Sequence, residues 1–221
     1  LVERLREVRA AVGEDVALRL DVNGAWAASV AHERLRGIAA AELGLEYVEQ
    51  PVAPGTPEAV AEALVAAREA TDGTVPLALD ESVTGPAAVR VLLASKVVDV
   101  LVVKPARVGG PAAALAIAAA AARAGVGVTI STMLETGVGL RSAMAVAAAI
   151  NGAAAHGLGT GGMLANDLVG GRSVVHGARA VASGGRGVGG DGGPQGWLGL
   201  DALLDRGAVE RFAVERIGSW R

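Results

Sequence analysis

The chain has 221 residues, a length that suits one domain with a substantial hydrophobic core. Its formal net charge at pH 7 is -3 and no basic cluster stands out, which argues against nucleic acid as the main partner. The absence of cysteine excludes disulfides and thiolate metal sites, and no apolar run is typical of a membrane span. We therefore expect a cytoplasmic protein with no membrane partner.

The apolar pattern predicts helices and strands that alternate along the chain. Large apolar residues at positions 1, 2, 5, 8 and 12 predict a first helix, which ends at Gly13. The predicted strands cover residues 16–21, 45–48, 75–79, 98–103 and 127–131, with a short last strand at 153–158. The predicted later helices cover residues 30–43, 57–70, 86–94, 111–124 and 137–150. Ser29 and Thr56 are the expected N-caps.

This alternation predicts an α/β fold with a parallel sheet and helical crossovers. A doubly wound sheet and a (β/α) barrel both satisfy the pattern. The barrel is favoured because charged residues stand at the C-terminal ends of successive predicted strands. In barrel enzymes these ends converge on one site, whereas in an open sheet they would be spread along an edge. We therefore expect a TIM-type barrel.

Three carboxylates, Asp21, Glu49 and Asp80, lie at or near the ends of consecutive predicted strands. If unpaired they would repel one another and their pKa values would rise, a problem that a divalent cation removes. Hard oxygen donors without a well-placed histidine favour Mg²⁺ or Mn²⁺ over zinc. The alternative is that each residue caps a helix or pairs with a lysine or arginine. Their position on consecutive strands favours the metal.

Lys104 stands at the end of the next predicted strand, just before Pro105. A lysine at this position could act as an acid/base or could stabilise an anion near the metal. The alternative is a simple ion pair with a neighbouring carboxylate. In combination with the three carboxylates, the functional interpretation is favoured.

Four motifs now carry a resemblance to a known family: Asp21-Val-Asn-Gly-Ala-Trp26, Val48-Glu-Gln-Pro51, Leu79-Asp-Glu-Ser82 and Val103-Lys-Pro105. In this order, over about residues 1–165, they resemble the strand-end motifs of the enolase superfamily, muconate-lactonizing subgroup. Two further segments, 130–140 and 156–168, resemble the o-succinylbenzoate synthases of that superfamily, particularly the actinobacterial form. Related epimerases and racemases usually carry an acidic substrate-binding motif on the last strand, where this chain has Gly157-Leu-Gly-Thr160.

The resemblance implies a Mg²⁺ ion held by Asp21, Glu49 and Asp80, with Mn²⁺ as a possible substitute. The metal would bind a small-molecule carboxylate substrate and stabilise the enediolate that forms when the α-proton leaves. Lys104 would add its positive charge to that stabilisation. In the synthases the step is the dehydration of 2-succinyl-6-hydroxy-2,4-cyclohexadiene-1-carboxylate, in menaquinone biosynthesis.

The resemblance also implies that Ser131, Thr132 and the backbone of Gly159 and Thr160 face the succinyl end of the substrate. The alternative is that these are ordinary residues of strand-to-helix turns. Two other functions remain open for the whole chain. One is a racemase, epimerase or cycloisomerase with the same metal ligands, and the other is a non-catalytic barrel scaffold.

The family pattern further implies a capping domain and two earlier barrel strands, the second ending in Lys-x-Lys, whose second lysine is the acid/base. No residue of this sequence matches that lysine, and Lys96 is a poor substitute because it precedes the strand predicted at 98–103. We therefore expect a barrel that is incomplete at its N-terminus and inactive by itself unless another chain completes it.

Of the histidines, His156 is near the predicted last strand, and a structural hydrogen bond is favoured for it over contact with substrate.

The chain is expected to divide into two parts. Residues 1–165 are the expected partial barrel domain. Residues 166–221 are the expected C-terminal segment, which would pack near the capping domain. Within this segment the glycine-rich stretch 183–193 is interpreted as a flexible loop rather than a phosphate-binding loop.

Overall fold

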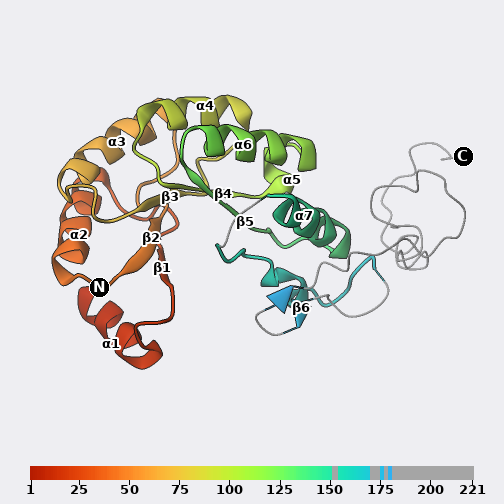
Figure 1. Cartoon of the computed structure of the whole chain (residues 1–221), viewed down its shortest axis with the longest axis horizontal. Coiled ribbons are helices and arrows are strands. Elements are labelled where there is room, and N and C mark those ends of the chain that lie inside the picture. Colours follow the sequence, from red (N-terminus) through yellow and green to blue (C-terminus); the bar gives the residue numbers. More distant parts are fainter. Residues whose placement is uncertain (151–153, 170–174, 177–178, 181–221) are drawn as a thin grey trace, which may run out of the picture. The chain divides into compact units, whose positions relative to one another are not determined.

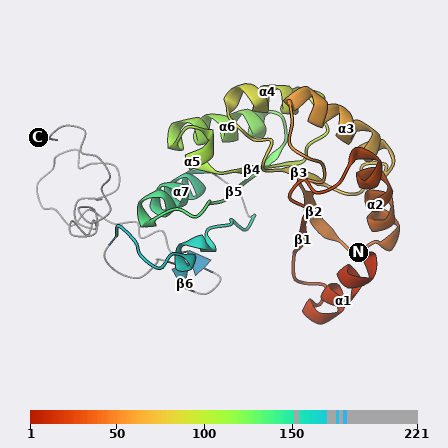
Figure 2. The same cartoon turned by 180° about the vertical axis from the view of Figure 1, so that it is seen from behind.

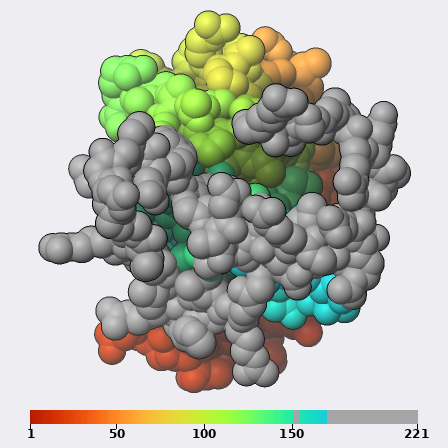
Figure 3. All heavy atoms as spheres, turned by 90° about the vertical axis from the view of Figure 1, so that its right-hand side faces the viewer, coloured from red at the N-terminus to blue at the C-terminus, as the bar shows by residue number. Residues whose placement is uncertain are grey.

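The computed structural model describes residues 1–150, 154–169, 175–176 and 179–180, the coloured parts of Figure 1. Figure 3 shows residues 1–150 and 154–169 in colour with all their heavy atoms. The chain divides into two compact units, Leu1–Thr129 and Ile130–Arg221. The glycine-rich stretch 183–193 lies outside the described residues. The expected division of the chain at residue 165 stays a prediction.

A sheet with the strand order β1-β2-β3-β4-β5 forms the centre of the first unit (Figure 1). Strands β1 to β4 pair in parallel, each with the next along the chain, as helical crossovers require. The strands are β1 (Leu18–Asp21), β2 (Leu45–Glu49), β3 (Leu77–Leu79), β4 (Val100–Val103) and β5 (Gly127–Ile130). This order confirms the predicted α/β fold, an incomplete barrel of the TIM type.

Helices cover one face of this sheet, and α2, α3, α4 and α6 form a row in which each packs against the next (Figures 1 and 2). Each buries an apolar stripe on the sheet, with Leu35, Leu64, Leu92 and Ile117 at most 1% exposed. No described helix is long and apolar enough to cross a membrane. The helices of this unit are α1 (Val2–Val12), α2 (Ala28–Ala41), α3 (Pro57–Glu69), α4 (Pro86–Ser95), α5 (Pro105–Val108) and α6 (Pro111–Arg123).

Helix starts show where the sequence pattern succeeded and where it failed. Thr56 caps α3 as predicted, because its hydroxyl accepts a hydrogen bond from the Ala59 amide at 3.3 Å. The prediction for Ser29 was wrong, since α2 begins at Ala28, two residues before the predicted start, after an Ala27 N-cap without a side-chain bond. The short helix α5 was not predicted.

The face of the sheet opposite these helices carries a small cluster of Tyr47, Ala78 and Val102. Side chains two residues apart on a strand share a face. Toward the C-terminal ends of the strands, the next residue on this face is therefore Glu49 after Tyr47 and Asp80 after Ala78. By the same alternation Val102 leads to Lys104. A packed layer therefore lies directly beneath the charged strand ends.

Buried Arg9 ties α1 to the start of the sheet. Its guanidinium donates hydrogen bonds to the backbone carbonyls of Gly13, Val16, Leu43 and Gly44, at 2.6 to 3.1 Å. One buried side chain thereby satisfies four carbonyl groups in the turns before β1 and β2.

The second unit contains the helix α7 (Gly137–Ala149), a 3-10 helix at Gly159–Met163 and a two-stranded antiparallel pair, β6 (Val175–His176) and β7 (Arg179–Ala180). The predicted strand at 153–158 was wrong for the residues that the structure describes there. Only an isolated bridge forms, between Ser131 and Gly157. A single bridge reflects a segment that turns at once into the 3-10 helix.

Candidate metal centre

The ends of four neighbouring strands bring the predicted charges to one edge of the sheet. Asp21 and Glu49 are the last residues of β1 and β2 and are paired in register. Asp80 and Lys104 directly follow β3 and β4. The four residues therefore lie at the same edge of the sheet, because the C-terminal ends of parallel strands share an edge.

Asp80 is the most buried of these groups, with a side chain only 5% exposed, and it forms an ion pair with Lys104, whose side chain is 19% exposed. Lys104 Nζ contacts Asp80 Oδ2. The other oxygen, Asp80 Oδ1, is buried and has no hydrogen-bond partner. A buried carboxylate oxygen without a partner is costly, and a hard cation would satisfy it.

The Glu49 carboxyl experiences the predicted repulsion. Burial, followed by the charges of Asp21 and Asp80, raises its pKa from 4.5 to about 7, although Lys104 opposes the shift. Near neutral pH this group is therefore poised between its protonated and ionised forms. A cation bound beside it would favour the ionised form.

The Asp21 side chain is turned toward its own loop. Its Oδ1 accepts from the Asn23 amide at 2.9 Å, and its Oδ2 accepts from Asn23 Nδ2 at 2.6 Å. Asn23 has a positive φ of 49°, a left-handed conformation that asparagine adopts more readily than most residues. In this arrangement each oxygen of Asp21 accepts one hydrogen bond from Asn23.

No three histidine or acidic side chains in the described part of the chain lie close enough together to hold a metal ion. Two of the three predicted ligands contact other side chains instead, since Asn23 binds Asp21 and Lys104 binds Asp80. The donor chemistry nevertheless fits a hard cation, since three carboxylates stand at neighbouring strand ends and one buried oxygen lacks a partner. The metal-ligand role of Asp21, Glu49 and Asp80 stays a prediction.

Two side chains near this edge were not singled out from the sequence. Glu81 has a buried Oε2 without a hydrogen-bond partner, and its charge also raises the pKa of Glu49. Gln50 is fully buried and hydrogen-bonded to the loop that carries Asp80. Both lie inside the motifs of the sequence analysis, so their positions, although not their contacts, could have been found there.

The four predicted substrate-binding residues belong to the second unit. Thr132 Oγ1 lies 3.1 Å from the Gly157 carbonyl and 2.8 Å from Thr160 Oγ1, while Thr160 also donates to the Met133 carbonyl at 2.6 Å. Ser131 makes a longer bond of 3.4 Å to Gly157, and Gly159 begins the 3-10 helix. These contacts give Thr132 and Thr160 a clear structural role in a turn. Contact of these residues with a substrate stays a prediction.

His156 accepts a hydrogen bond at Nδ1 from the Ile130 amide, at 3.1 Å. This contact confirms the predicted structural hydrogen bond of this histidine.

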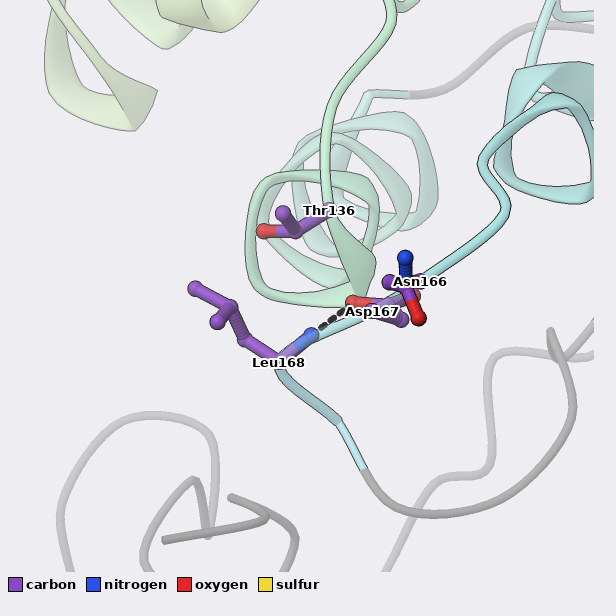
Figure 4. A pocket seen from close by; sticks show the side chains of 4 residues that line it. All are labelled: Thr136, Asn166, Asp167 and Leu168. Carbon is purple, nitrogen blue, oxygen red and sulfur yellow. Dashed lines mark hydrogen bonds between the residues drawn. The ribbon is translucent and has the colours of Figure 1, made fainter. Parts of the chain in front are cut away.

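A cavity of about 260 Å³ lies at the start of α7 and is lined by Thr136, Asn166, Asp167 and Leu168 (Figure 4). Asp167 accepts from the Gly137 amide at 2.8 and 2.9 Å and from the Leu168 amide at 2.6 Å. Its negative charge therefore sits at the positive end of the helix. The carboxylate is engaged as a helix cap supplied from thirty residues away in the sequence.

Comparison with known proteins identifies the family. Residues 1–191 match the family model described as "Enolase C-terminal domain-like". The chain is 35% identical over 181 residues to o-succinylbenzoate synthase of Mycolicibacterium smegmatis, an alignment that covers 81% of this chain and 52% of the relative. It is 31% identical over 148 residues to L-Ala-D/L-Glu epimerase of Bacillus subtilis, which covers 66% of this chain and 38% of the relative.

A solved structure agrees with these relatives. The substrate-liganded L-Ala-D/L-Glu epimerase of Bacillus subtilis superposes with a TM-score of 0.67 at 32% identity, covering 77% of this chain and 46% of that chain. Muconate lactonizing enzyme of Pseudomonas putida superposes with a TM-score of 0.68 at 23% identity, covering 77% of this chain and 45% of that chain, a likeness of fold alone. The chain spans about half the length of the relatives it matches, or less.

Proposed function

Because the chain belongs to the enolase C-terminal domain-like family, we propose that it is the metal-binding part of a Mg²⁺-dependent lyase of the o-succinylbenzoate synthase type. The observation that carries the proposal is the convergence of Asp21, Glu49, Asp80 and Lys104 on adjacent ends of parallel strands. The proposed reaction is the dehydration of 2-succinyl-6-hydroxy-2,4-cyclohexadiene-1-carboxylate, on the menaquinone pathway.

In this proposal Asp21, Glu49 and Asp80 hold the cation. When bound, Mg²⁺ supplies Lewis-acid stabilisation of negative charge on a substrate carboxylate. Asp80 Oδ1, buried and without a partner, is the best-prepared ligand atom, whereas each oxygen of Asp21 already accepts one hydrogen bond from Asn23. Mn²⁺ is expected to substitute because it shares the preference for oxygen donors.

Lys104 has a defined part in this proposal. It is held at the strand end by its ion pair with Asp80, and its side chain is only 19% exposed. With Asp80 as a ligand of the cation, the Lys104 ammonium group would be available to stabilise a substrate anion at the same edge of the sheet. Lys104 thus acts by charge and not as the proton acceptor.

A second lysine is required as the acid/base, and the sequence contains only one further lysine, Lys96. Lys96 terminates α4 in the left-handed conformation and precedes β4, so it lies at the opposite end of that strand from Lys104. We therefore propose that residues 1–221 do not catalyse the reaction by themselves and that the base comes from outside them.

An epimerase acting on a dipeptide or a racemase acting on an N-succinyl amino acid is the second candidate. It is favoured by the match to the Bacillus subtilis epimerase, in both sequence and structure. The synthase is preferred because its match extends over more of the chain, 81% against 66%. The segment Gly157-Leu-Gly-Thr160, where the epimerases usually carry an acidic motif, supports the same choice.

Two assays test the proposal. Mn²⁺ binding followed by electron paramagnetic resonance should show one site that Asp80→Ala abolishes; unchanged binding in that variant would favour a non-catalytic scaffold. Dehydration and N-succinyl amino acid racemization should then be measured side by side, on this chain and on a longer version that carries a Lys-x-Lys strand. Racemization without dehydration in the longer version would exclude the synthase.

A further inference from the structure

Gln50 is an unusual residue at the candidate metal centre. It directly follows Glu49, and its side chain is fully buried, at 0% exposed. Its backbone has a φ of 38°, in the left-handed region that a residue with a Cβ rarely adopts. Such a conformation persists only where the surrounding contacts compensate for its cost, and it is found preferentially at functional sites.

The amide group of Gln50 is bonded on both sides to its surroundings. Its Oε1 accepts from the backbone amides of Asp80 and Ser82, each at 3.2 Å. Its Nε2 donates to the Val52 carbonyl at 2.9 Å and to Ser82 Oγ at 2.8 Å. The two donor hydrogens and the acceptor oxygen are therefore all used, and two of the bonds fix the backbone on either side of Glu81.

The backbone of Gln50 makes two further connections. Its N–H donates to the Ala78 carbonyl on β3 at 2.8 Å, and its carbonyl accepts from the Gly24 amide at 2.7 Å. Gly24 belongs to the turn after Asp21, and a Cβ at this position would lie 2.9 Å from Pro54 Cδ. The turns that follow β1, β2 and β3 are thus all bonded to one residue.

We propose that Gln50 is a positioning residue that sets the relative placement of the three carboxylates Asp21, Glu49 and Asp80. The inference rests on the proposed function, because it assumes that these carboxylates bind one cation. Gln50 itself does not contact the metal in this proposal. It acts through the backbone of the loops that carry Asp21 and Asp80, much as outer groups orient metal ligands elsewhere.

The variant Gln50→Met tests the proposal, because methionine matches the shape of glutamine but removes its hydrogen bonds. We expect Gln50→Met to bind Mn²⁺ about 10- to 100-fold more weakly than the parent chain, the range found for outer-sphere substitutions. Amide hydrogen exchange should also show faster exchange at Asp80 and Ser82 in the metal-free variant. Both proteins are compared under conditions in which urea unfolding shows them to be folded.

The matched control is Asp99→Asn, a second polar anchor of β3 at the opposite end of the sheet. Asp99 accepts from Arg68 at 2.7 and 3.0 Å and from the Leu77 amide at 2.9 Å. Its loss destabilises the same strand without touching the carboxylates. We expect Mn²⁺ affinity within about twofold of the parent chain, as for a site remote from the change.

Each outcome decides a separate point. If the parent chain binds Mn²⁺ and Gln50→Met binds it within twofold, the role of Gln50 is overturned while the proposed function stands. Equal weakening by Asp99→Asn would also overturn it, since a general loss of stability would then explain the effect. If the parent chain binds no Mn²⁺, the proposed function fails. In that case only the hydrogen exchange of the Asp80 and Ser82 amides tests the positioning role of Gln50. Unchanged protection of these amides in Gln50→Met overturns that role, and lost protection supports it.

Discussion

Replacement of Glu49 by glutamine should stabilise the metal-free protein above neutral pH. Burial and the neighbouring charges of Asp21 and Asp80 raise the pKa of Glu49 from 4.5 to about 7. In the folded state the group therefore binds its proton more tightly than in the unfolded chain. Its contribution to stability is fully present below pH 4.5 and is lost as the pH rises through about 7.

The size of this effect follows from the pKa values. The difference between 4.5 and about 7 corresponds to roughly 3 kcal/mol between the two protonation states. Partial exposure of the side chain to water reduces this to about 1–3 kcal/mol. Glutamine resembles the protonated acid in shape and cannot ionise. The stability of Glu49→Gln relative to the parent chain should therefore rise by that amount between pH 5 and pH 8.

Urea unfolding without divalent cations, at intervals from pH 5 to pH 8, measures this difference. The exposed helical residue Glu62 supplies the control, because Glu62→Gln should change stability by less than about 0.5 kcal/mol at every pH. A flat difference between Glu49→Gln and the parent chain, or a loss of stability in the variant at pH 8, would refute the reasoning.

Cation binding should reverse the order of these two proteins. At a Mg²⁺ concentration of about 100 times its dissociation constant, the parent chain should gain about 2.7 kcal/mol. Glu49→Gln lacks one of the three proposed carboxylate ligands and should gain much less. The same urea series repeated at pH 8 with Mg²⁺ measures this gain. An equal gain in both proteins would show that the cation binds elsewhere.

Three further substitutions test other parts of the structure. Lys104→Met should lower the free energy of unfolding by about 2–4 kcal/mol without metal, because it leaves the Asp80 carboxylate buried and unpaired. Saturating Mg²⁺ should restore part of this stability in urea unfolding. A loss that Mg²⁺ does not change would contradict the competition between the cation and Lys104 for Asp80. Asp167→Ala should lower the free energy of unfolding by about 1–2 kcal/mol, because it removes the cap of α7. Amide hydrogen exchange should be faster at Gly137 in this variant, and unchanged exchange would exclude the capping role. Arg9→Met should lower the free energy of unfolding by about 2–4 kcal/mol, since four backbone carbonyls lose their hydrogen-bond donor. A decrease below about 0.5 kcal/mol in thermal unfolding would show that water replaces the guanidinium as the donor.

The local pattern of the sequence was sufficient for the elements that carry the candidate site. Apolar runs of four to six residues that end in Asp21, Glu49, Asp80 or Lys104 alternate with helical stretches, and such alternation permits few folds. Proline at the first helical position marked α3, where Thr56 also caps the helix. Ser29 failed as a cap, because α2 begins before it at Ala28. The pattern places a helix start only within a residue or two.

The contacts between strand ends needed the tertiary structure. Sequence spacing placed the carboxylates at one edge, yet it could not show that Lys104 engages Asp80 while Asn23 engages Asp21. These choices depend on side-chain rotation and on burial, which the chain acquires only on folding. The raised pKa of Glu49 has the same origin, because burial is its largest cause.

The sequence by itself determined which residues stand at the strand ends, since strand length and the two-residue alternation of side chains are local properties. Only the tertiary structure decided how those residues are held. Gln50 shows the difference most clearly: its hydrogen bonds join turns that are about thirty residues apart in sequence, and no local pattern predicts them. A site assembled from several strands depends on contacts between segments distant along the chain, and these form only when the sheet brings the segments together.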